Sequence, residues 1–128
     1  MHLKKLFWIY TIILILLALL PVNGSGSVIN HTFVVSIRLD YMIHCIIYLP
    51  WMYLLSKLTG INISHRFLRT LIIIFTAFMF SIINEVVQYY LPYRAFNIND
   101  LLANMLGIAM GFLFFFLVPN QLFRKKTT

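Results

Sequence analysis

The sequence has very few acidic residues and few charged residues of any kind. Only 10% of its 128 residues are charged, and the acidic ones are just Asp40, Glu85 and Asp100. A soluble domain usually carries about 25% charged residues. Because 62% of the chain is hydrophobic, the composition excludes an ordinary soluble domain and predicts an integral membrane protein.

Cysteine is almost absent as well. The single residue, Cys45, excludes an intramolecular disulfide and a cysteine-based metal motif. Asp, His and Glu side chains are also metal ligands, but their spacing here matches no metal motif, so neither a metal nor a cofactor is expected. The formal net charge of +7 comes from basic residues between apolar runs, a pattern that favours membrane topology over nucleic-acid binding.

Long apolar runs are what the chain has instead. A helix needs roughly 20 apolar residues to cross a bilayer, and four segments meet this requirement: residues 6–22, 40–58, 67–91 and 98–118. The length allows one domain over residues 1–128. The sequence therefore predicts an all-α fold, an integral membrane four-helix bundle. The first segment also has features of a cleaved signal peptide, but a retained anchor is favoured because its apolar core is at the upper length limit of such peptides.

The distribution of lysine and arginine predicts the orientation. Eight of the ten lie before the first segment, in or beside the connection between the second and third, or after the fourth, whereas Arg38 and Arg94 lie in the other two connections. Basic residues are enriched in cytoplasmic segments, so both termini are predicted to be cytoplasmic. The same topology places all three acidic residues on the outer side, a coincidence that chance explains poorly.

Polar residues in three predicted helices recur at helical spacing. The sets are Asp40, His44 and Tyr48; Ser81, Asn84, Glu85 and Gln88; and Asp100 and Asn104, followed by Gly107 and Gly111. Residues at these spacings share one helix face. Because polar faces avoid lipid, the three faces are expected to converge inside the bundle. The Gly107-x-x-x-Gly111 pattern predicts close packing of the last helix on a neighbour.

This polar cluster has two interpretations. In the structural one, Glu85 pairs with Arg94 or His44, Asp100 caps the last helix, and amide side chains join the helices. In the functional one, the cluster is a binding site open to the outer leaflet, where Arg94 contacts an anionic group. Glu85 and His44 would orient the ligand or act as acid and base. The candidate binding residues are Asp40, His44, Tyr48, Glu85, Gln88, Arg94, Asp100 and Asn104.

The order of these residues is itself distinctive. The chain reads Asp40-x3-His44-x3-Tyr48, then Ser81-x3-Glu85-x2-Gln88-x3-Pro92-x-Arg94-x5-Asp100-x3-Asn104-x2-Gly107-x3-Gly111. This pattern resembles the VanZ-like family of small bacterial membrane proteins over about three of the four helices. It departs at Tyr41, where the family pattern leads us to expect a lysine; Arg38 is a candidate to replace that charge.

The resemblance implies a multi-pass protein of the bacterial cytoplasmic membrane, with its site facing the cell wall. The family's namesake is associated with low-level resistance to the glycopeptide teicoplanin, so the expected partner is a membrane lipid or a lipid-linked cell-wall ligand. A homo-oligomer is compatible with the sequence. Two other classes of function stay open: an intramembrane enzyme acting on a lipid-linked phosphate or glycan headgroup, for which Ser81 is the one candidate nucleophile, and a structural scaffold.

Overall fold

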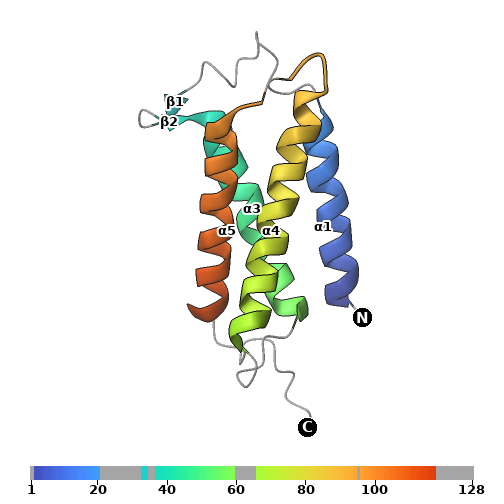
Figure 1. Cartoon of the computed structure of the whole chain (residues 1–128), viewed down its shortest axis with the longest axis vertical. Helices are drawn as coiled ribbons and strands as arrows, with labels where there is room; N and C mark the ends of the chain where they lie inside the picture. The colour runs from blue at the N-terminus through green and yellow to red at the C-terminus, as the bar shows by residue number, and fades with distance from the viewer. Residues whose placement is uncertain (1, 21–32, 35–36, 60–65, 95, 118–128) are drawn as a thin grey trace.

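The structure, a computed structural model, describes residues 2–20, 33–34, 37–59, 66–94 and 96–117. Its main elements are four long helices that run side by side (Figure 1). They are α1 (His2–Leu19), α3 (Leu39–Thr59), α4 (Arg66–Tyr89) and α5 (Ile98–Leu117). The predicted all-α class is confirmed, and each helix ends within a few residues of its predicted segment.

A short antiparallel pair that the sequence did not predict precedes α3. Strand β1 (Phe33–Val34) pairs with β2 (Ile37–Arg38), so that Phe33 lies opposite Arg38. Two-residue strands are too short to show the alternating pattern by which strands are recognised in a sequence. Because β2 leads directly into α3, it holds Arg38 beside the first turn of that helix.

Three helices are long and apolar enough to cross a membrane: His2–Leu19, Phe67–Tyr89 and Ile98–Phe115. Their outer faces expose large apolar side chains, among them Trp8 and Phe75. A protein surrounded by water rarely exposes so much apolar surface, whereas lipid tails accommodate it. The chain is therefore a multi-pass membrane protein.

The remaining predicted span, α3, is long enough but does not reach the apolarity of the other three helices. Helix α3 packs most extensively on α5 and also contacts α1 and α4. Its polar residues Asp40 and His44 are buried against the other helices. Since these polar residues face protein, that side of α3 is less constrained by contact with lipid, which explains why its sequence is more polar than that of its neighbours.

Basic and acidic residues occupy opposite ends of the bundle. The start of α1 and the end of α5 lie at one end (Figure 1). This end carries Lys4 and Lys5 on α1, Lys57 in the last turn of α3 and Arg69 near the start of α4. The acidic residues lie near the opposite end. The predicted grouping of basic residues is thus seen within the described ranges, while the cytoplasmic location of that end stays a prediction.

Two glycines allow α5 to lie directly on the backbone of α3. A methyl group added at Gly107 would collide with the carbonyl oxygen of Cys45, and one added at Gly111 would collide with that of Leu49. Cys45 and Leu49 are one turn apart on α3, as the two glycines are on α5. The predicted close-packing face is therefore present, and α3 is the helix that it meets.

Trp51 holds α1 and α4 against the middle of α3. Its indole stacks on Phe80 with 4.6 Å between ring centroids, and its Nε1 donates to Thr11 Oγ1 at 3.0 Å. An aromatic pair of this kind contributes about 0.5–1.5 kcal/mol beyond the area that it buries. This apolar layer positions the helices whose polar residues meet closer to the acidic end.

Candidate functional site

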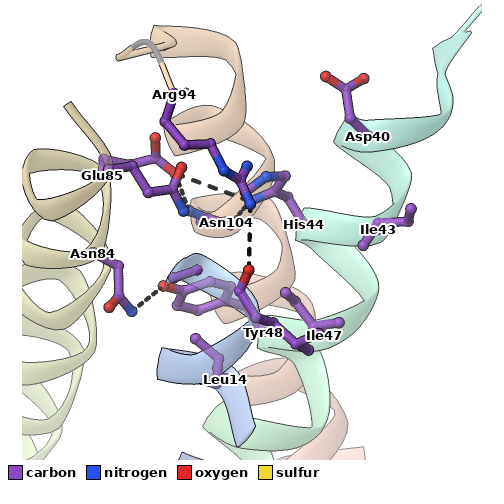
Figure 2. Close-up of a pocket in the computed structure, with 13 residues that line it drawn as sticks. Leu14, Asp40, Ile43, His44, Ile47, Tyr48, Asn84, Glu85, Arg94 and Asn104 are labelled. Atoms are coloured by element: carbon purple, nitrogen blue, oxygen red, sulfur yellow. Dashed lines mark hydrogen bonds and ion pairs between the residues drawn. The ribbon is translucent and has the colours of Figure 1, made fainter. Parts of the chain in front are cut away.

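A cavity of about 70 Å³ lies between the helices near the acidic end (Figure 2). Its polar lining comes from α3, α4, α5 and the α4–α5 connection: Asp40, His44, Tyr48, Asn84, Glu85, Gln88, Arg94 and Asn104. Its apolar lining comes from α1 and α3: Leu14, Leu17, Ala18, Ile43 and Ile47. A cavity of this size admits a few water molecules or a small polar group.

His44, Asn104 and Glu85 form a hydrogen-bonded chain across three helices. His44 Nδ1 lies 2.9 Å from Asn104 Oδ1, and Asn104 Nδ2 donates to Glu85 Oε1 at 3.0 Å. With this amide orientation, His44 carries its proton on Nδ1. His44 Nδ1 also lies 3.9 Å from Glu85 Oε1. All three side chains are buried, so the predicted convergence of these residues is present in the structure.

Asp100 extends this chain to the start of α5. Its Oδ2 lies 3.9 Å from His44 Nε2, while its Oδ1 accepts from Asn97 Nδ2 at 3.0 Å. Asn97 Oδ1 accepts from the backbone N–H of Asn99 at 3.0 Å, as an N-terminal helix cap does. The sequence interpretation gave the capping role to Asp100 and missed Asn97. An asparagine three residues before an acidic residue is the pattern by which this cap could have been found.

Asp40 pairs with Arg38 rather than with the His44 chain. Arg38 donates to both carboxylate oxygens, from Nε at 3.1 Å and from Nη2 at 2.5 Å. The same guanidinium lies over the ring of Tyr41, 4.6 Å from its centroid, and the Tyr41 hydroxyl accepts from Asn99 Nδ2 at 3.3 Å. Arg38 therefore supplies the positive charge that the resemblance led us to expect at position 41.

Arg94 joins the α4–α5 connection to the end of α1. It donates to the carbonyl oxygen of Leu20 from Nε at 3.1 Å and from Nη2 at 2.7 Å, and to that of Leu17 at 3.3 Å. Tyr93 adds a hydrogen bond from its hydroxyl to the carbonyl oxygen of Leu19 at 2.9 Å. Burial lowers the pKa of Arg94, and the nearby carboxylates of Asp100 and Glu85 oppose that shift. The guanidinium satisfies carbonyls that a helix end leaves unpaired.

Tyr48 completes the wall below the His44 chain. It is almost fully buried, and its hydroxyl accepts a hydrogen bond from Asn84 Nδ2 at 2.9 Å. Gln88 is also buried and lines the cavity. Seven of the eight candidate residues thus line one cavity, and the eighth, Asp100, lies behind it through its contact with His44.

Glu85 has one carboxylate oxygen with no hydrogen-bond partner. The side chain is completely buried, and Oε1 accepts from Asn104, but Oε2 is unpaired. Glu85 lies at the cavity wall and its carboxylate points towards His44 and Arg94 (Figure 2). An unpaired buried acceptor is costly, more so when it is charged. Glu85 therefore leaves one acceptor without a donor beside the cavity.

The described residues around the cavity include neither a metal-binding group nor a serine or cysteine nucleophile. Within the described residues, no group of three His, Cys, Asp or Glu side chains is arranged to hold a metal ion. Neither Ser81 nor Cys45 lies among its lining residues. Ser81 is fully buried one turn from Glu85.

The contribution of α1 was missed entirely by the sequence interpretation. Leu14, Leu17 and Ala18 form part of the cavity wall. The carbonyl oxygens of Leu17 and Leu20, at the end of α1, accept hydrogen bonds from Arg94. Asn84 was placed on the polar face but not among the binding residues. A helix of almost uniform apolar sequence gives no pattern that marks which of its faces meets the site.

Comparison with known families agrees with the motif. The profile of the family described as VanZ/LLP1 matches residues 7–119. The chain belongs to the VanZ/LLP1 family. The VanZ/LLP1 match begins within α1 and so includes the helix that the motif spacing did not cover. No curated protein and no solved structure matches the chain.

Proposed function

We propose that this VanZ/LLP1 protein is a binding protein of the bacterial cytoplasmic membrane. Its cavity takes the polar group of an amphiphile, a lipid or a lipid-linked cell-wall molecule, from the outer leaflet. Through this binding it contributes to tolerance of envelope-directed glycopeptides of the teicoplanin type. The observation that carries the proposal is the cavity lined by Glu85, whose Oε2 is an unpaired acceptor.

The cost of burying these groups supports a functional role. An ionisable side chain costs about 2.5–3.5 kcal/mol at the bilayer centre on insertion scales, and somewhat less near the interface. Close packing of α3 on α5 is already provided by Gly107 and Gly111, and α1 and α4 are joined through Trp51. Glu85 takes part in neither of these contacts, which favours a ligand-binding role for its side chain.

The lining of the cavity favours an amphiphile. Apolar residues of α1 and α3, such as Leu14 and Ile43, face polar residues of α4 and α5, such as Glu85 and Asn104. A lipid places its headgroup and the start of its acyl chains at the corresponding depth near the membrane surface. One wall would therefore contact hydrocarbon while the other binds the polar group.

The size of the cavity limits what it binds directly. About 70 Å³ is too small for a glycopeptide or a sugar chain. We therefore place the protein's effect on glycopeptides at the level of a membrane lipid or a precursor lipid, of which only a small polar group enters the cavity.

The proposal is tested by comparing phenotype with membrane abundance. Glu85→Gln and Asn104→Ala should each lower teicoplanin tolerance of an expressing strain while the amount of protein in the membrane is unchanged. Tyr89→Phe, which alters an exposed residue one turn beyond Glu85, is the matched control and should behave as wild type. Loss of abundance in parallel with tolerance, or wild-type tolerance in both site variants, would contradict the proposal.

A further inference from the structure

The cavity's unpaired group identifies the chemistry of the partner. Glu85 Oε2 has no donor, whereas Oε1 has Asn104 Nδ2 at 3.0 Å. Because the side chain is completely buried, bulk solvent does not supply the missing donor. A ligand that fits the site must therefore bring an N–H or O–H group to this oxygen.

Both arginines at this end of the bundle already donate to protein acceptors. Arg94 donates to the carbonyls of Leu17 and Leu20 at the end of α1, and Arg38 donates to both oxygens of Asp40. An anionic ligand would have to displace one of these sets of bonds. It would also lie beside the Glu85 carboxylate, so the geometry disfavours the anion that the sequence had suggested for Arg94.

The charges around the cavity favour a cation. Within the described ranges, this end of the bundle carries three carboxylates, Asp40, Glu85 and Asp100, against the two guanidinium groups of Arg38 and Arg94. The carboxylates therefore outnumber the guanidinium groups by one. A buried excess charge is stabilised by an opposite charge that also donates hydrogen bonds.

We infer that the cavity binds a primary ammonium group, with the Glu85 carboxylate as its acceptor. This inference rests on the proposed function and names the ligand class for that same site. A primary ammonium has three N–H donors and fits the small volume of the cavity. A trimethylammonium group is larger and has no N–H, so it would leave Glu85 Oε2 unpaired. The amphiphile that presents the group is of the aminophospholipid type, with its apolar part beside the Leu14 and Ile43 wall.

The test measures which lipid the full-length protein retains. Wild type is reconstituted in nanodiscs containing equal amounts of phosphatidylethanolamine, phosphatidylcholine and phosphatidylglycerol, and the lipids bound after release are quantified by native mass spectrometry. A charge-assisted hydrogen bond changes affinity by roughly tenfold to a hundredfold. Phosphatidylethanolamine should therefore be enriched about tenfold or more over phosphatidylcholine, which differs from it only by three methyl groups on nitrogen.

Two further measurements test whether Glu85 is the acceptor and whether the amine of the headgroup determines binding. Glu85→Gln should lose the enrichment, while the control Tyr89→Phe should keep it. Added ethylammonium chloride should displace phosphatidylethanolamine from wild type, because the free amine shares the headgroup chemistry. Lack of displacement would mean that the acyl chains or the phosphate determine retention, and would overturn the inference.

The lipid preference of the wild-type protein tests the ammonium assignment even if Glu85→Gln does not fold. Equal retention of phosphatidylcholine, or preference for phosphatidylglycerol, would overturn the ammonium assignment while leaving the proposed binding function intact. Retention of no lipid at all would overturn both.

Discussion

Arg94 donates two hydrogen bonds to the carbonyl oxygen of Leu20, at 3.1 and 2.7 Å, and so ties the α4–α5 connection to the end of α1. This contact closes one side of the cavity, since Arg94 and the α1 residue Leu17 both line it. A positive charge at a helix C-terminus is also favourable for the helix dipole. Arg94 is therefore assigned a positioning role that differs from direct contact with an anion.

Substitution of Arg94 by lysine separates these two roles. Lysine keeps the charge but cannot make the forked contacts to the Leu17 and Leu20 carbonyls. We expect Arg94→Lys to destabilise the protein by about 0.5–1.5 kcal/mol, the usual net contribution of a hydrogen bond, because these contacts lie at an exposed position. The measurement is thermal unfolding in detergent. Unchanged stability in Arg94→Lys, with loss of function only when the charge is removed in Arg94→Gln, would favour the anion-binding role instead.

The Arg38–Asp40 pair gives a rescue experiment. Asp40 is almost fully buried, so Arg38→Gln leaves a buried carboxylate without its cation, a change that costs about 3–5 kcal/mol in buried ion pairs and less here because Arg38 is partly exposed. Adding Tyr41→Lys to Arg38→Gln should restore much of the lost stability, because it puts a cation at the position where the family pattern leads us to expect one.

The control for this pair is Tyr41→Lys alone, which should lose the contacts of Tyr41 with Arg38 and Asn99 but keep the Arg38–Asp40 pair, and so should destabilise the protein less than Arg38→Gln does. Thermal unfolding of the four proteins forms a double-mutant cycle. Additive losses in the double variant would show that position 41 does not replace Arg38.

The glycine face of α5 predicts a steric effect. Gly107→Ala places a methyl group against the Cys45 carbonyl on α3, and backbone cannot move aside as a flexible side chain would. Overpacking of this kind costs about 1–3 kcal/mol, so Gly107→Ala should lower the unfolding temperature in detergent. Leu106→Ala, at an exposed neighbouring position, should leave it nearly unchanged. Equal unfolding temperatures for wild type and Gly107→Ala would contradict the observed helix contact.

The orientation of the bundle is tested by thiol labelling. Cys45, the single native cysteine, is first replaced in Cys45→Ala, and one new cysteine is then introduced at either end. A membrane-impermeant maleimide should label Tyr93→Cys in intact cells, and should label Lys57→Cys only after the cells are broken. The reverse pattern would place the cavity on the cytoplasmic side.

The sequence was sufficient to predict the helices and the convergence of their polar faces, because apolar length and helical spacing directly determine both. It was not sufficient to predict the partner of each side chain. Arg94 and Glu85 are close in the chain, yet Arg94 donates to α1 and Glu85 accepts from Asn104. Such pairings depend on the rotation of each helix and on the path of the α4–α5 connection. The nearly uniform apolar sequence of α1 carries no information about either.

The most direct measurement of the central claim is an experimental structure in lipid containing phosphatidylethanolamine. We expect density for a lipid headgroup in the cavity, with its nitrogen about 2.7–3.2 Å from Glu85 Oε2, the distance of an N–H···O hydrogen bond. A cavity closed by protein, with Glu85 Oε2 paired to a side chain of the same molecule and no lipid beside it, would show that Glu85 does not bind an ammonium group.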